Sequence, residues 1–113
     1  MENRRKAPRI PLITMARVTP HELQPSAEAL VRDISTGGMG VYVKGRYQKG
    51  DMLLVKVSFE TTEGKIIKEA LTGRIAWVKS LEEGQLAVGI EIPDMERKHP
   101  SLYAYVKQQE EMR

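Results

Sequence analysis

The residues best suited to bind a ligand form a short polar break between two apolar runs. Asp33 and Ser35 stand two residues apart, and three glycines follow at positions 37, 38 and 40. On a strand, residues two apart share a face, so the carboxylate and the hydroxyl would lie side by side, with Ile34 on the opposite face. With glycine backbone amides nearby, they could read the polar edge of a flat ligand. The same residue types also form ordinary Asx and Ser turns, which this stretch alone favours.

A second group with chemical potential is the basic cluster at the start of the sequence. Residues 1–9 hold four basic residues against one acid, and this excess of three equals the formal net charge of +3 of the whole chain. Guanidinium groups bind phosphates bidentately and match guanine O6 and N7. A small, concentrated cluster indicates one compact anion rather than long nucleic acid. Pro8 and Pro11 disfavour helix around Arg9, so we expect these residues to form an arm that can bind the anion. The alternative is a disordered basic tail, which is common at chain ends.

Composition limits the classes of protein and of site. The 113 residues suit one domain, and a hydrophobic content of 41% with 29% charged residues is ordinary for a soluble fold. The absence of cysteine excludes disulfides, cysteine–metal sites and thiol catalysis, and fits a reducing compartment. No apolar run is long enough to span a membrane, and the charged start lacks a secretion signal core. We therefore expect a cytoplasmic protein.

Short apolar runs separated by turn residues predict six strands followed by a helix. The expected strands cover residues 12–19, 28–34, 39–43, 52–59, 66–80 and 85–92. The composition of the last segment favours helix, and the main helix should begin near Pro100. This pattern predicts a small closed or nearly closed antiparallel barrel with a C-terminal helix. We expect one domain made of an arm (1–11), a barrel (12–93) and a helix (94–113).

Three residues within these elements have environments that the pattern only partly predicts. Gly73 stands in the middle of the long fifth strand, where glycine often indicates a bulge or bend. Simple alternation puts Trp77 on the same face as Ile75, where it could pack in the core or offer a stacking surface. His99 stands just before the main helix, and we expect it to cap the helix start.

The motifs of enzymes are missing from the sequence. The two histidines lie far apart, there is no cysteine, and no Gly-x-Ser-x-Gly or P-loop motif occurs. Gly38-Met39-Gly40 is no dinucleotide fingerprint, because a strand rather than a helix follows it. We therefore expect a binding protein rather than an enzyme.

Two motifs, taken together, resemble those of a known family. Arg5-Lys6-Ala7-Pro8-Arg9 resembles the R-x-x-x-R element of PilZ domains, and Asp33-Ile34-Ser35-Thr36-Gly37-Gly38 resembles their D/N-x-S-x-x-G element. Their order and separation also match the family. Residues 73–78 and 87–91 look like two late strands of that fold. The resemblance covers roughly residues 3–106.

The resemblance implies a six-stranded antiparallel PilZ-type β-barrel that acts as a non-enzymatic receptor for bis-(3′,5′)-cyclic dimeric GMP (cyclic di-GMP). Arg5 and Arg9 would grip guanine and phosphate, and Asp33 and Ser35 would bond a guanine edge. The other ligand-binding residues that the resemblance implies are Arg4, Gly37, Gly38, Trp77 and Gly89. No metal and no further cofactor are implied.

The resemblance also implies a bacterial signalling role, commonly in motility or biofilm control, through an unidentified downstream protein. We expect no long nucleic acid, no membrane insertion, and a monomer or weak dimer. One alternative is a PilZ-like protein-interaction adaptor that does not bind nucleotide. The presence of Arg5, Arg9 and Asp33 argues against this alternative. Another is a barrel that binds single-stranded nucleic acid, which would need more exposed aromatic residues than a content of 5% provides.

Overall fold

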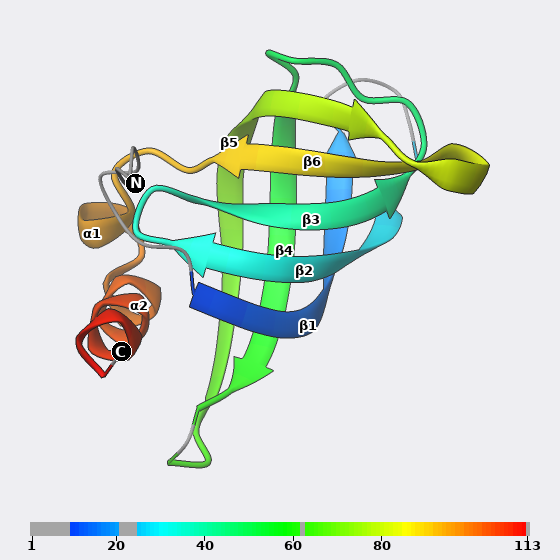
Figure 1. Cartoon of the computed structure of the whole chain (residues 1–113). Helices are drawn as coiled ribbons and strands as arrows, with labels where there is room; N and C mark the ends of the chain where they lie inside the picture. Colours follow the sequence, from blue (N-terminus) through cyan, green and yellow to red (C-terminus); the bar gives the residue numbers. More distant parts are fainter. Residues whose placement is uncertain (1–9, 21–24, 62, 113) are drawn as a thin grey trace, which may run out of the picture.

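The computed structural model describes residues 10–20, 25–61 and 63–112, and Figure 1 shows them as a curved set of strands with two helices beside it. The predicted site residues Arg4, Arg5 and Arg9 lie outside these ranges. Within them, neither helix has the length and apolar character that crossing a membrane would require.

Six antiparallel strands form a closed barrel in the order β1-β2-β3-β6-β5-β4. Their bounds are β1 Ile10–Pro20, β2 Ala27–Ser35, β3 Gly38–Lys44, β4 Met52–Glu60, β5 Ile66–Ser80 and β6 Gln85–Glu91, with a short 3₁₀ turn, Glu82–Gly84, between the last two. Because β1 pairs with both β2 and β4, the barrel has no open edge. The predicted closed barrel is confirmed, and each predicted strand end falls within two residues of the observed one.

Alternation along the strands fills the barrel with branched aliphatic side chains. In β4, Val55, Val57 and Phe59 are buried, whereas Lys56 and Ser58 between them are exposed. A strand turns successive side chains to opposite faces, so this period of two produces an apolar interior and a polar exterior. The core therefore holds the strand backbones rigidly enough to position side chains at the barrel surface.

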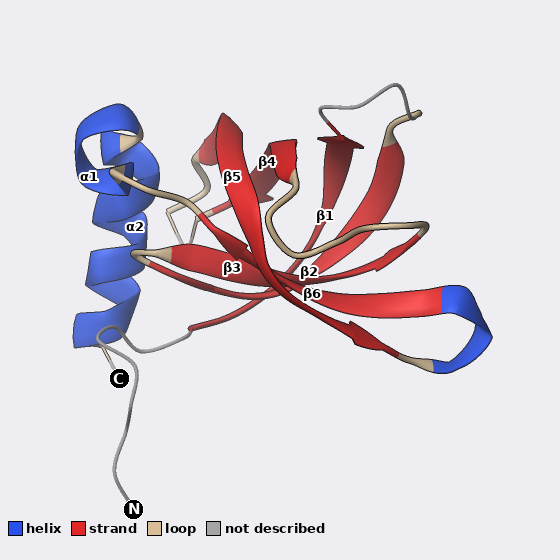
Figure 2. Cartoon of the chain, turned by 90° about the horizontal axis from the view of Figure 1, so that it is seen from above, coloured by secondary structure: helices blue, strands red, loops and turns tan. Residues whose placement is uncertain are grey.

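Two helices, α1 Met95–Lys98 and α2 Pro100–Glu111, lie together on one side of the barrel in both views (Figures 1 and 2). Leu102 and Val106 on α2 are fully buried, and α2 contacts β1 and β5. Pro100 is the first residue of α2, as predicted. His99 occupies the N-cap position, but its side chain makes no cap hydrogen bond, so the expected capping role is wrong. Its Nδ1 instead lies 2.9 Å from Glu69 Oε1 on β5.

A β-bulge in β5 changes which residues face the core. Ile75 pairs with Ile90 and Trp77 with Gly89, so Ala76 is an extra residue with no partner on β6. Beyond the bulge, Val78 packs against the core and Trp77 does not. The face predicted for Trp77 is therefore wrong, because the inserted residue reverses the alternation.

The glycine in the middle of β5 has a different role from the predicted one. The bulge lies at Ala76 rather than at Gly73. A Cβ atom at position 73 would lie 2.5 Å from Ile90 Cγ2 and 2.9 Å from the Glu91 carbonyl oxygen. Gly73 thus allows β5 to approach the end of β6 closely.

Candidate functional site

A pocket of about 220 Å³ opens where the turn between β2 and β3 meets β5 and β6. Its lining residues are Ser35, Gly37, Gly38, Met39, Ala76, Trp77, Gly89, Ile90 and Glu91. Five of the predicted ligand-binding residues therefore lie around one cavity, although they come from three separate parts of the chain. β3 brings the turn to this place by pairing with β6, where Gly38 lies opposite Glu91 and Gly40 opposite Gly89.

Asp33 lies beside this pocket rather than in its lining, two residues before Ser35 on β2. Its Oδ1 accepts a hydrogen bond from the Gly40 amide at 3.2 Å, and its Oδ2 accepts one from Arg32 Nε at 2.9 Å. These two hydrogen bonds hold the carboxylate close to the turn that joins β2 and β3. Asp33 and Ser35 are both half-buried and Ile34 between them is fully buried, as the strand pattern predicted.

Arg32 is a neighbour of the site that sequence reasoning missed. Val31 pairs with Val41 and Asp33 with Gly40, so Arg32 is the extra residue of a second β-bulge. The bulge lets two successive residues both avoid the core, which brings the Arg32 guanidinium to the Asp33 carboxylate. The guanidinium also lies 5.6 Å from the centre of the Tyr42 ring. Contact with the Tyr42 side chain, and next the Asp33 carboxylate, raise the pKa of Arg32 above its ordinary value.

The hydroxyl of Ser35 holds the turn together. It accepts a hydrogen bond from the Gly37 amide at 3.2 Å and donates one to the Gly38 carbonyl at 3.4 Å. The local turn predicted as the plain interpretation is therefore present. The second bond is near the upper limit of hydrogen-bond length, so the hydroxyl proton is held weakly. A stronger acceptor placed in the pocket could take that proton over.

Close packing explains two of the pocket glycines. A Cβ atom at position 38 would overlap the carbonyl oxygen of Ile90, and one at position 89 would overlap the indole Nε1 of Trp77. Neither residue has a positive φ, so close approach rather than backbone conformation requires glycine here. At position 37, by contrast, a Cβ atom would have no neighbour within 4 Å, so the backbone of Gly37 borders open space.

Glu91 is a further pocket residue for which the sequence offered no distinctive signal. It is exposed, lines the cavity, and lies opposite Gly38 on β3 and Arg74 on β5. Its carboxylate can accept hydrogen bonds from the N–H groups of a ligand ring. Alternation after the buried Ile90 predicts an outward position, but only the barrel places it at this cavity.

Together these groups offer a flat indole wall, hydrogen-bond acceptors and backbone amides, in a space suited to one ring system. Drug-sized ligands occupy pockets of about 300–1,000 Å³, so this cavity has room for only a part of such a ligand. Among the described residues, no group of three His, Cys, Asp or Glu side chains is arranged to hold a metal ion.

Solved structures with the same architecture share little sequence with this chain. The inhibitor of motility MotI/DgrA from Bacillus subtilis aligns over 96% of this chain and 50% of its own length, at 15% identity and a TM-score of 0.76. This chain thus spans about half of that protein. The PilZ domain of YcgR from Escherichia coli, solved with c-di-GMP, aligns over 97% and 91% of the two chains, at 12% identity and a TM-score of 0.69.

The MrkH–c-di-GMP complex from K. pneumonia gives 95% and 51% coverage, 14% identity and a TM-score of 0.63. No curated protein matches the chain. At such identities these likenesses show the fold alone. The family model described as the PilZ domain, however, matches residues 3–108, a span that contains both predicted motifs and the whole barrel. Sequence and architecture agree, and this chain belongs to the PilZ domain family.

Proposed function

We propose that this chain is a non-enzymatic receptor for cyclic di-GMP that acts in the bacterial cytoplasm. The observation that carries the proposal is the register of the first two strands. Ile10 pairs with Ile34 and Pro11 with Asp33, so β1 begins beside the Asp33–Ser35 motif. Arg9 precedes Ile10 directly, and one peptide unit spans only about 3.8 Å between Cα atoms. The chain that carries Arg4, Arg5 and Arg9 therefore joins the barrel at the edge of the pocket.

The pocket is suited to one guanine base rather than to the whole dinucleotide. Trp77 supplies a stacking face, and Ser35 and Asp33 supply hydrogen-bonding groups for the guanine edge. The absence of a side chain at Gly37 leaves open space for the ring, and the absence of one at Gly89 makes room for the Trp77 indole. The phosphates then face outward, where the guanidinium groups of Arg4, Arg5 and Arg9 bind them.

Binding would act as a switch through charge. The clustered arginines repel one another, and a dianionic ligand neutralises them and folds the arm across the barrel. Ordering of the arm over the barrel changes the surface that a downstream protein contacts. Two of the similar structures, those of YcgR and MrkH, contain c-di-GMP, and a third is an inhibitor of motility, which supports an effector role of this kind.

Calorimetric titration with cyclic di-GMP tests the proposal and reports the number of ligands bound per chain. We expect the wild-type protein to bind, and the variants Arg5→Ala and Arg9→Ala to show no measurable binding with unchanged far-UV circular dichroism. Lys6→Ala is the matched control, because it removes one positive charge and keeps both arginines. Wild-type affinity in both arginine variants would contradict the proposal. A wild-type protein that binds no nucleotide would favour the adaptor alternative.

A further inference from the structure

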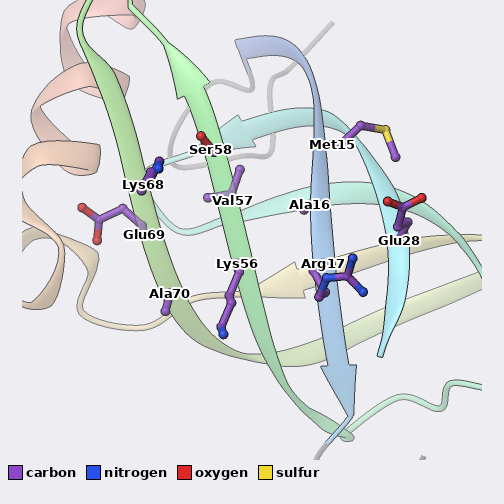
Figure 3. Close-up of a pocket in the computed structure, with 10 residues that line it drawn as sticks. All are labelled: Met15, Ala16, Arg17, Glu28, Lys56, Val57, Ser58, Lys68, Glu69 and Ala70. Carbon is purple, nitrogen blue, oxygen red and sulfur yellow. The ribbon is translucent and has the colours of Figure 1, made fainter. Parts of the chain in front are cut away.

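A second, larger cavity lies on the outside of the barrel, across β1, β4 and β5 (Figure 3). This outer groove has a volume of about 510 Å³ and shares no residue with the pocket beside the β2–β3 turn. Its lining residues are Met15, Ala16, Arg17, Glu28, Lys56, Val57, Ser58, Lys68, Glu69 and Ala70. The proposed nucleotide site makes no use of any of them.

The floor of the outer groove is apolar and partly open to solvent. Met15 is 53% exposed, and Leu30, its partner across the β1–β2 pairing, is 37% exposed. Beneath them, Ala16 and Val57 belong to the packed core. Methionine is flexible and polarizable, so it adapts to the shape of an apolar group placed on it. Met15 therefore gives the groove a surface for an apolar side chain, and Leu30, which lies outside the lining, extends this surface across the β1–β2 pairing.

Positive charge surrounds this floor. Arg17 on β1 lies directly opposite Lys56 on β4, and Lys68 stands on β5. Like charges opposite one another on a sheet are unfavourable, so this pairing does not serve the stability of the barrel. Within the described ranges, none of these three side chains takes part in an ion pair.

The acidic residues of the outer groove leave most of this charge uncompensated. Glu69 is already engaged, because its Oε1 lies 2.9 Å from His99 Nδ1 at the start of α2. Figure 3 shows its carboxylate directed away from Lys56 and Arg17. Glu28 lies opposite Arg17 across the β1–β2 pairing and is the remaining acid of the lining. Three cations thus face one available carboxylate, and the groove is complementary to a negatively charged group.

We propose that the outer groove docks an acidic segment of a partner protein, with an apolar side chain on Met15 and carboxylates at Arg17, Lys56 and Lys68. The proposal deepens the receptor function, because it assigns the surface through which the receptor engages its partner. The same strand serves both sites: β1 begins beside the Asp33 motif and continues to Met15 and Arg17. Its pairing with β2 contains an irregularity between Pro11 and Thr14, so the two parts of β1 are joined by a bulge.

The test uses fluorescence anisotropy with a short labelled peptide of glutamates interrupted by leucines at helical spacing. A second peptide carries serine in place of each leucine. Both are titrated with the full-length protein, with and without cyclic di-GMP, and with the variants Met15→Ser, Lys56→Glu and Arg17→Glu. Lys49→Glu is the matched control, since Lys49 is an exposed lysine on a turn outside the groove. Each altered side chain lies at the surface, and circular dichroism checks folding.

We expect the leucine peptide to bind in at least one nucleotide state, and each charge reversal in the groove to weaken binding about tenfold. Met15→Ser and the serine peptide should each weaken binding as well, whereas Lys49→Glu should not. Nucleotide affinity, measured in parallel, should be unchanged in every groove variant, which separates failure of this proposal from failure of the receptor function.

Three results would overturn the groove proposal. The first is no peptide binding to the wild-type protein in either nucleotide state. The second is equal binding by the groove variants and by Lys49→Glu. The third is a different occupant: groove-dependent binding of vesicles containing phosphatidylserine, or groove-dependent self-association in sedimentation, in either case without peptide binding.

Discussion

Trp77 lies against Gly89, so closely that a side-chain carbon at position 89 would overlap the indole ring. The bulge at Ala76 turns the indole away from the core, and the missing side chain of Gly89 gives it a place on the outside of β6. The two residues form one wall of the pocket beside the β2–β3 turn. In the proposed function, this wall is the face on which a guanine base stacks.

The first prediction concerns this wall. Trp77→Ala should weaken cyclic di-GMP binding by roughly 1–3 kcal/mol, about five- to 150-fold, because one base loses its stacking partner. Gly89→Ala should displace the indole and produce a similar loss. If Gly89 acts only through Trp77, the double variant should be no weaker than Trp77→Ala alone, a non-additivity that calorimetry can measure. Additive losses would show that Gly89 acts independently.

The second prediction separates two neighbouring glycines by stability. Gly38→Ala should destabilise the barrel by roughly 1–3 kcal/mol or more, because its Cβ would overlap the backbone carbonyl of Ile90 and β3 must move away from β6. Gly37→Ala should change the free energy of unfolding by less than about 0.5 kcal/mol, since its Cβ would meet open space. Urea unfolding measures both, and equal effects would contradict this packing.

The third prediction concerns the attachment of the C-terminal helix. His99 Nδ1 and Glu69 Oε1 lie 2.9 Å apart, and both side chains are mostly buried, with 15% and 20% of their areas exposed. A double-mutant cycle with His99→Ala and Glu69→Ala should give a coupling energy of about 0.5–1.5 kcal/mol in unfolding experiments. The exposed pair of Arg97 with Asp94 is the control, and Arg97→Met should cost less than about 0.5 kcal/mol.

The fourth prediction is a pH dependence. Burial raises the pKa of Tyr47 above its usual value of 10.0, since the core disfavours the phenolate. The unfolded chain therefore ionises first, and the stability from this residue is complete below about pH 10 and lost as the pH rises through the folded pKa. Tyr47→Phe should reduce the fall in unfolding free energy above about pH 10. Urea unfolding between about pH 8 and pH 11 compares the two proteins, and parallel curves would contradict the prediction.

The sequence by itself determined the elements and their order. Alternation in β4, turn residues between strands and the proline at position 100 are local signals, and local sterics decide what they form. The side-by-side placement of Asp33 and Ser35 also followed from the sequence, because residues two apart on a strand share a face. That Ser35 lines one pocket with Trp77 and Gly89, with Asp33 beside it, could be expected only from the family resemblance.

Tertiary structure alone decided which side chains leave the core near the pocket. A bulge shifts register by one residue, and with a period of two this reverses every later side chain on the strand. For this reason the sequence assigned Trp77 to the wrong face and did not reveal Arg32 as a neighbour of the site. No residue type in either stretch marks the residue that the bulge inserts. Glu91 joined the pocket because β6 pairs with β3, and His99 contacts Glu69 because α2 packs against β5. Those contacts depend on packing between elements, which local patterns do not contain.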